Sequence, residues 1–197
     1  MPKIVDHDSR REEVAQAVWQ VIAKRGIGAT TIREIARAAR CSTGVLAHYF
    51  KDKNELLLYA LRIASMRAAN RMQKRMLESA GGETLRRVIY EALPIDKERR
   101  TEWQIWVSFW GEAVSNASFV KEQKRRYIEW RAFARDLLLE EQRAGRIRKD
   151  IDAKKEADSI IALVDGVGLQ ATIEPRRLPP KRQREIVDRY LSTLSCR

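Results

Sequence analysis

Three helix-start signals follow one another at short intervals near the N-terminus, and they constrain the fold more than any other feature of the sequence. Thr31 and Glu34 have the spacing of a capping box, in which the hydroxyl and the carboxylate each bind an orphan backbone N–H. Ser42 can cap a second helix, and Asp52 with Glu55 repeats the N-cap-to-N3 spacing for a third. Two short helices that begin so close together predict a helix-turn-helix.

We call residues Thr30–Leu57 the reader segment, since a helix-turn-helix is typical of proteins that read DNA. Its helices are predicted at about 32–39 and 43–50. The apolar side chains that would hold these helices together recur through both: Ile32, Ile35, Ala36, Ala39, Val45 and Leu46.

The overall charge agrees with a nucleic-acid partner. The 197-residue chain has a net charge of +12 and a sequence pI near 10.0, which favours attraction to a polyanion. A solvated basic surface would give the same numbers. The charge therefore supports the reader segment without proving its role.

The sequence lacks the features typical of membrane proteins, secreted proteins and enzymes. No apolar run approaches the roughly 20 residues that span a bilayer, and the N-terminus has no apolar signal-peptide core. Cys41 and Cys196 lie far apart in the chain, and His7 and His48 are poorly placed for catalysis. We therefore expect a cytoplasmic protein that is not an enzyme, uses no metal or other cofactor and has no membrane partner.

Helical periodicity continues through the remainder of the chain. Ser9 with Glu12 predicts the start of a first helix, and Gly26 predicts its end. Six further helices are predicted from apolar spacing, caps and prolines. They lie at about 53–79, 84–92, 118–143 and 152–173, with one that carries the aromatic residues between 103 and 110 and a last one after Pro180. The predicted fold is all-α with about nine helices. A DNA-binding domain is expected over residues 1–53, and a ligand-binding and dimerisation domain over 54–197, with the helix at 53–79 as the connector.

The reader segment resembles the helix-turn-helix of the tetracycline-repressor family of transcriptional regulators. The resemblance rests on TTI-x-x-IA at 30–36, CSTG-x-L-x-x-YF at 41–50 and KDK-x-ELL at 51–57. The choline-responsive repressors of betaine synthesis are the most similar subgroup, through STG at 42–44, HYF at 48–50, WVSFW at 106–110 and Asp165-Gly166. The resemblance implies a repressor rather than an activator.

One residue departs from that pattern. Family members usually have glycine in the turn where this sequence has Arg40. Glycine would supply a positive φ at little cost, whereas arginine is strained there or adopts another turn geometry. We therefore expect a slightly strained turn or a stronger phosphate contact.

The resemblance assigns DNA-contacting roles residue by residue. Arg33 would reach a base edge, since arginine is the usual bidentate partner of guanine. The predicted major-groove contacts are Thr43, Gly44, Val45, Ala47 and His48, and the predicted phosphate contacts are Thr31, Arg40, Tyr49 and Lys53. Most of the groove-facing side chains are small, so phosphate contacts and DNA shape should carry much of the specificity.

An aromatic concentration in the second half of the chain is the candidate effector site. Aromatic faces beside a carboxylate suit an organic cation, and Glu91, Glu102 and Glu112 are candidate carboxylates. The predicted ligand-binding residues are Tyr90, Trp103, Trp106, Phe109, Trp110, Tyr127 and Trp130. The alternative is that these aromatic residues only form the hydrophobic core.

The last two predicted helices carry a candidate dimer surface. The resemblance implies a four-helix interface with a twofold mate, formed by Ile160, Leu163, Val164, Val167, Ile186, Val187 and Tyr190. Alternatively, these apolar faces close the core of a single chain. A dimer would place two readers about one helical turn apart on a palindromic operator.

Taken together, the sequence predicts a dimeric repressor that binds a palindromic DNA operator and is released by a small-molecule inducer, for which an organic cation is one candidate. A basic DNA-binding protein without sequence specificity is the main alternative, and an activator of the same fold is a lesser one.

Overall fold

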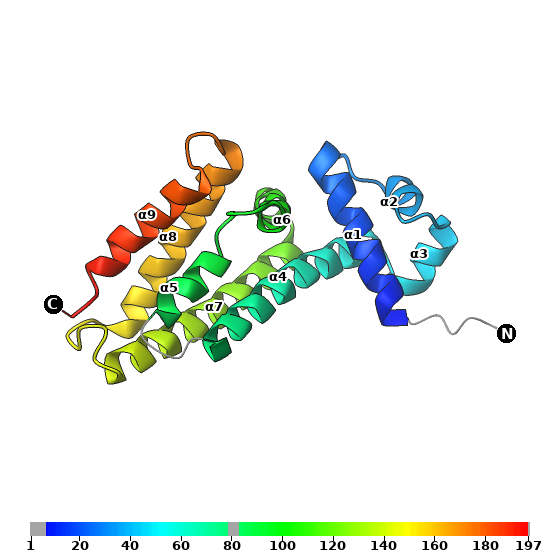
Figure 1. Cartoon of the computed structure of the whole chain (residues 1–197). Coiled ribbons are helices and arrows are strands. Elements are labelled where there is room, and N and C mark those ends of the chain that lie inside the picture. The colour runs from blue at the N-terminus through cyan, green and yellow to red at the C-terminus, as the bar shows by residue number, and fades with distance from the viewer. Residues whose placement is uncertain (1–6, 79–82, 197) are drawn as a thin grey trace. The chain divides into compact units, whose positions relative to one another are not determined.

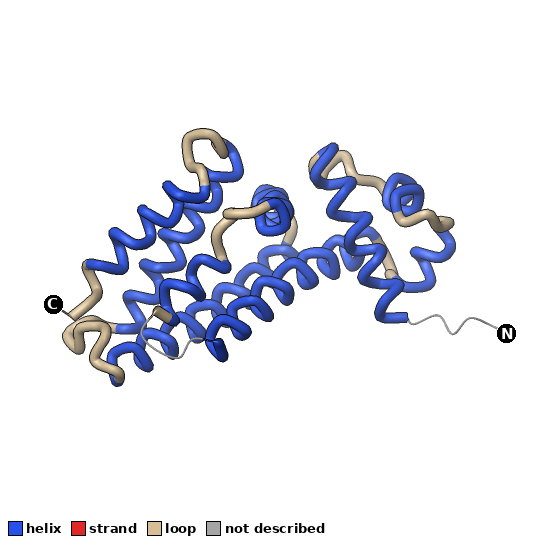
Figure 2. The backbone as a smooth tube through the Cα atoms, viewed as in Figure 1, coloured by secondary structure: helices blue, strands red, loops and turns tan. Residues whose placement is uncertain are grey.

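The computed structural model describes residues 7–78 and 83–196, and this part of the chain consists of helices joined by loops and turns (Figures 1 and 2). Its nine helices are α1 (His7–Arg25), α2 (Ile32–Ala38), α3 (Thr43–Tyr49), α4 (Lys53–Glu78), α5 (Thr84–Glu91), α6 (Lys97–Ala113), α7 (Ala117–Arg143), α8 (Ala153–Ile173) and α9 (Pro180–Ser192). The described residues contain no strand, and a single isolated β-bridge joins Ile147 to Ser195. The all-α prediction is confirmed.

Two compact units make up the structure. The first contains the chain up to Arg67 together with Gln104–Val120, and the second contains Ala68–Trp103 together with the chain from Lys121 onward. The first unit therefore extends beyond the three N-terminal helices. The predicted functional boundary at residue 53 stays a prediction.

In the first unit, α1 packs against α2, and α2 packs against α3 (Figure 1). The core between them is formed by buried aliphatic side chains such as Val18, Ile35 and Leu46. A buried polar contact ties α1 to α4, because the Trp19 indole N–H donates to the Ala60 carbonyl at 3.0 Å. These contacts fix the short helices α2 and α3, which would be marginal in isolation.

In the second unit, α9 packs against both α5 and α8 (Figure 1). Trp103 lies deep in this unit, and its indole N–H donates to the Ala92 carbonyl at 2.7 Å. The Trp103 ring packs against Gly168 of α8 so closely that a Cβ at that position would lie 2.0 Å from a ring carbon. Gly168 is therefore required for the approach of α6 to α8.

Helix ends agree closely with the sequence signals, with one exception. Gly26 and Gly145 both adopt positive φ after α1 and α7, as expected of residues that end helices. The predicted start at Ser9 was wrong, because α1 already begins at His7. Nothing between His7 and Ser9 breaks a helix, so adding residues to the existing helix is favoured. The predicted end of the fourth helix at residue 79 lies outside the described residues.

No described helix is long and apolar enough to cross a membrane.

Candidate nucleic-acid interface and effector module

The cap of α2 is a complete capping box. The Thr31 hydroxyl accepts the Glu34 backbone N–H at 3.3 Å, and the Glu34 carboxylate accepts the Thr31 backbone N–H at 3.2 Å. The hydrogen bond from the Thr31 hydroxyl, together with nearby Arg25, lowers the pKa of Glu34. The predicted box is confirmed, and it fixes the start of the first reader helix.

The next two caps are also present. The Ser42 hydroxyl accepts the Val45 backbone N–H at 3.3 Å, which starts α3. Asp52 accepts the Glu55 backbone N–H at 2.8 Å, and Glu55 in turn accepts the Lys51 backbone N–H at 2.6 Å. The predicted cap by Asp52 is therefore confirmed. Glu55, however, binds the backbone N–H of Lys51, the residue before Asp52.

Arg40 adopts a left-handed conformation in the turn between α2 and α3. Its φ is +51°, and no other non-glycine residue of the described chain has a positive φ. The turn is closed by the Cys41 backbone N–H, which donates to the Ala36 carbonyl at 2.9 Å. Arginine in this region is strained by about 1–2 kcal/mol relative to its preferred conformations. The predicted strain is confirmed, and the Arg40 side chain is exposed.

The recognition helix α3 presents small side chains on its open face. Thr43, Gly44, Ala47 and His48 are exposed, whereas Leu46 is buried. A Cβ at Gly44 would touch only the Ser42 hydroxyl, at 3.7 Å, so no internal contact requires a glycine there. This absence of a side chain leaves room for a close approach of a partner such as DNA.

The remaining predicted DNA contacts surround this face. Arg33 and Thr31 are exposed on or beside α2, and Lys53 is half-buried at the start of α4. Tyr49 is half-buried, and its ring lies edge-on to the His48 ring with centroids 5.3 Å apart. Val45 is half-buried. The structure thus leaves every predicted contact at least partly accessible.

The predicted ligand-binding aromatics fall into two burial classes. Trp103, Trp106 and Phe109 of α6 are almost fully buried. Tyr90, Trp110, Tyr127 and Trp130 are half-buried. The first class occupies core positions, as the alternative reading expected, and only the second class offers partly open faces.

Arginines neutralise two of the three candidate carboxylates. Glu102 accepts two hydrogen bonds from Arg71, at 2.8 and 2.5 Å. Glu91 accepts Arg75 Nε at 2.8 Å and pairs with Arg99 Nη1 at 3.0 Å. Burial lowers the pKa of Arg71, but the hydrogen bonds and charge of Glu102 outweigh it and raise the pKa overall. These carboxylates are therefore balanced within the fold before any cation binds.

Sequence reasoning missed a different acidic group, Asp165 of α8. The Tyr127 hydroxyl donates to Asp165 Oδ2 at 2.7 Å, and burial raises the pKa of Asp165. Burial and this hydrogen bond raise the pKa of Tyr127 to about 12. Arg126 beside them is buried, which lowers its pKa to about 10. The sequence showed Asp165 only as part of the Asp165-Gly166 motif that resembles the family. Nothing in the sequence indicated that Tyr127, on a different helix, donates a hydrogen bond to this carboxylate.

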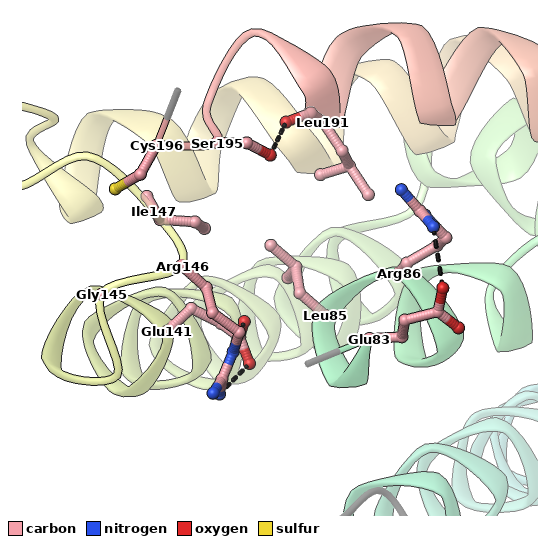
Figure 3. A pocket seen from close by; sticks show the side chains of 10 residues that line it. All are labelled: Glu83, Leu85, Arg86, Glu141, Gly145, Arg146, Ile147, Leu191, Ser195 and Cys196. Atoms are coloured by element: carbon pink, nitrogen blue, oxygen red, sulfur yellow. Dashed lines mark hydrogen bonds and ion pairs between the residues drawn. The ribbon is translucent and has the colours of Figure 1, made fainter. Parts of the chain in front are cut away.

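A cavity of about 200 Å³ lies elsewhere in the second unit (Figure 3). Leu85, Ile147 and Leu191 form its apolar part. Two ion pairs flank them: Arg86 with Glu83, and Arg146 with Glu141. Since each arginine is already paired with a carboxylate, the cavity does not present an unbalanced charge to a ligand.

The predicted dimer residues also divide by burial. Leu163, Ile186 and Tyr190 are half-buried, and the Tyr190 hydroxyl donates to Glu156. The other members of the set lie in the core of the protomer: Ile160, Val164, Val167 and Val187. Those four close the core of the chain, which leaves Leu163 and Ile186 as the accessible apolar groups of the proposed surface.

Comparison with known proteins decides the family. The model for the C-terminal domain of BetI-type transcriptional repressors matches residues 82–195, and the model for bacterial regulatory proteins of the tetR family matches residues 16–60. The chain belongs to the TetR family, and its C-terminal region is of the BetI type. The resemblance of the reader segment to the tetracycline-repressor family is thereby confirmed.

Individual relatives of this TetR-family regulator align over nearly its whole length. It is 29% identical to the regulator BetI of Proteus mirabilis over 97% of this chain and 94% of BetI. It is 27% identical to the regulator PksA of Bacillus subtilis over 98% of this chain and 94% of PksA. A regulator from Saccharomonospora viridis, solved in complex with choline, is 26% identical with a TM-score of 0.86, covering 96% of this chain and 100% of that one.

Proposed function

We propose that this TetR-family protein is a dimeric repressor that binds a palindromic operator and is released by a small organic cation. The observation that carries the DNA-binding part is the exposed face of α3, a helix that is capped at its start and presents small side chains. Arg33 and Arg40, which precede α3, are exposed as well. Such a face admits close contact with a groove and its phosphates.

The dimer would use the accessible side of α8 and α9. Leu163 and Ile186 are half-buried apolar residues on these helices, and a Cβ at Gly166 would meet nothing within 4 Å. A second copy related by twofold symmetry would cover these groups and allow close helix approach at Gly166. Two readers held in this way would match two half-sites about one helical turn apart.

The proposed effector is a quaternary ammonium compound, with choline as the probe. The choline complex of the Saccharomonospora viridis regulator supports this class. Tyr127 and Asp165 supply an aromatic ring and a carboxylate in the second unit, and this combination suits an organic cation. The Arg131 guanidinium carbon lies 5.3 Å from the Tyr127 ring centroid, so a ligand would share the ring with it or displace it. Glu91 and Glu102 are poorer candidates, because each forms a direct ion pair with an arginine, whereas Asp165 has Arg126 and Arg131 nearby without a direct ion pair among the described residues.

DNase footprinting on genomic fragments tests the proposal. We expect protection of one short palindrome, and we expect choline to release it. Uniform coating of all fragments would instead indicate a DNA-binding protein without sequence specificity. Protection that choline leaves unchanged would retain the repressor and remove this effector class.

Two variants separate the parts of the proposal. Asp165→Asn should keep the footprint but need at least about tenfold more choline for release, corresponding to about 1.4 kcal/mol. The double variant Leu163→Glu/Ile186→Glu should sediment as a monomer and lose the footprint. A persistent dimer of that variant would move the interface to another surface.

A further inference from the structure

Arg11 of α1 lies over two neighbouring aromatic rings at the end of the recognition helix. Its guanidinium carbon is 5.2 Å from the Phe50 ring centroid and 4.9 Å from the Tyr59 ring centroid. The two rings are themselves in contact, with centroids 5.4 Å apart. Phe50 is the C-cap of α3, so the guanidinium is fixed directly beside the helix that is predicted to enter the groove.

The charge of Arg11 is not neutralised by the chain. Among the described residues, no carboxylate forms an ion pair with Arg11, and its buried Nε atom has no hydrogen-bond partner. The neighbouring Arg10 differs, because it pairs with Glu13 at 2.5 Å. A partly buried cation without an anion is unfavourable, and stacking on aromatic faces offsets only part of that penalty.

Stacking also decides which part of the guanidinium remains available. Aromatic rings generally contact the flat faces of a guanidinium, whose N–H donors lie in its plane. The Nε atom of Arg11 is buried, which leaves the two terminal Nη groups as donors to an external partner. A side chain held in this way loses little conformational entropy when it binds an oxyanion. The contact with two rings therefore positions the terminal Nη groups of Arg11 for a phosphate-like anion.

We propose that Arg11 binds a backbone phosphate of DNA, as an additional contact of the reader. This inference rests on the proposed DNA-binding function and extends it to a residue of α1, outside the helix-turn-helix. The position supports the assignment, since Phe50 is followed directly by Lys51 and then by Lys53, a predicted phosphate contact. The contact is independent of base sequence, because it involves only the backbone.

Arg67 provides a matched comparison within the same unit. Its guanidinium carbon lies 4.7 Å from the Trp19 ring, so it stacks on an aromatic side chain in the same manner. Arg67 lies 14 residues beyond Lys53 on α4, which corresponds to about 21 Å along the helix. Stacking alone would give Arg11 and Arg67 the same role, whereas a phosphate contact is expected only of Arg11.

The experiment measures binding of the full-length protein to duplex DNA over a series of salt concentrations. The probe is a duplex that the wild-type protein selects from a random-sequence pool, with a mixed-sequence duplex alongside. Each phosphate contact contributes about 0.9 to the slope of log affinity against log salt. Arg11→Met should therefore lower the slope by about 0.9 per reader, or about 1.8 for a dimer, on both duplexes. Arg67→Met should leave the slope unchanged.

An unchanged slope in Arg11→Met, with a loss of thermal stability similar to that of Arg67→Met, would overturn the inference and leave Arg11 as a contact between helices. If Arg11→Met does not fold, Arg11→Gln gives the answer, because it removes the charge while its planar amide can still pack on the two rings. It should lower the slope by the same amount of about 0.9 per reader, and an unchanged slope would overturn the inference. Failure of the wild-type protein to select any sequence would refute the proposed repressor. The mixed-sequence duplex would still test Arg11 in that event.

Discussion

The reader segment and the second unit are stabilised by polar contacts of opposite range. In the reader, the polar contacts that start α2, α3 and α4 join residues three or four positions apart. In the second unit, Arg71 reaches Glu102 across 31 positions, and the Tyr90 hydroxyl donates to Asp188 across 98. Local caps leave the reader surface open, whereas the long-range contacts occupy the charged groups of the second unit.

This difference matches two different tasks. A DNA-binding face needs side chains that are positioned but not already engaged, and exposed Arg33 and the small residues of α3 meet that need. A sensing unit needs its internal charges balanced, because an unpaired buried charge would destabilise it in every state. The buried Glu91 and Glu102 satisfy this condition through Arg71, Arg75 and Arg99.

The largest predicted effect tests the buried ion pairs. Glu102→Ala would leave Arg71 without its bidentate partner, in a site where the Glu102 side chain is only 1% exposed. Removing one member of a buried pair costs about 3–5 kcal/mol, and we expect the lower end because Arg71 retains Glu91 and Glu98 nearby. Urea unfolding of the full-length protein measures this loss.

Glu129→Ala is the control, since Glu129 pairs with Arg125 at the surface. It should change the free energy of unfolding by less than about 0.5 kcal/mol. The double variant Arg71→Met/Glu102→Leu should recover much of the loss. Equal effects of Glu102→Ala and Glu129→Ala would show that the long-range pairs do not stabilise the second unit.

The second prediction concerns apolar packing in the same unit. Gly168→Ala would place a methyl group 2.0 Å from a carbon of the Trp103 ring. Overpacking of a core by this amount destabilises by about 1–3 kcal/mol. Gly111→Ala is the control, because Gly111 also lies within a helix and nothing lies within 4 Å of its Cβ.

Gly111→Ala should stabilise the protein by up to about 1 kcal/mol, since alanine has the higher helix propensity. Thermal unfolding of both variants measures the difference. If both variants were stabilised, Trp103 would not pack against Gly168 as the structure shows.

The same contrast explains what the sequence could predict. The caps at Thr31, Ser42 and Asp52 could be predicted because each joins residues three positions apart, and such spacing is visible in a sequence. The same spacing at Ser9 and Glu12 did not mark a helix start, because α1 already begins at His7. The pairing of Glu91 and Glu102 with arginines could not be predicted, because it depends on how α4, α5 and α6 pack.

Burial imposed a similar limit on the candidate sites. Helical periodicity placed Leu163 and Val167 on one apolar stripe, but the structure buries Val167 within the chain and leaves Leu163 partly open. An apolar stripe shows which side of a helix faces other groups, and it does not show whether those groups belong to the same chain. Tyr127 was predicted as a ligand-binding aromatic residue. Its hydrogen bond to Asp165 could not be predicted, because it depends on how α7 packs against α8.

The smallest predicted effect tests whether the reader trades stability for DNA contact at Arg40. Glycine would relieve the strain of φ +51°, worth about 1–2 kcal/mol, and would lose about 0.5–1 kcal/mol through its greater freedom in the unfolded chain. Arg40→Gly should therefore stabilise the protein by about 0–1.5 kcal/mol while weakening its binding to every DNA sequence. Arg40→Ala should weaken binding equally without the gain in stability, because alanine keeps the strained φ. Chemical unfolding and salt-dependent DNA titration of both variants measure the two effects, and unchanged affinity in both would show that Arg40 strains the turn without a compensating phosphate contact.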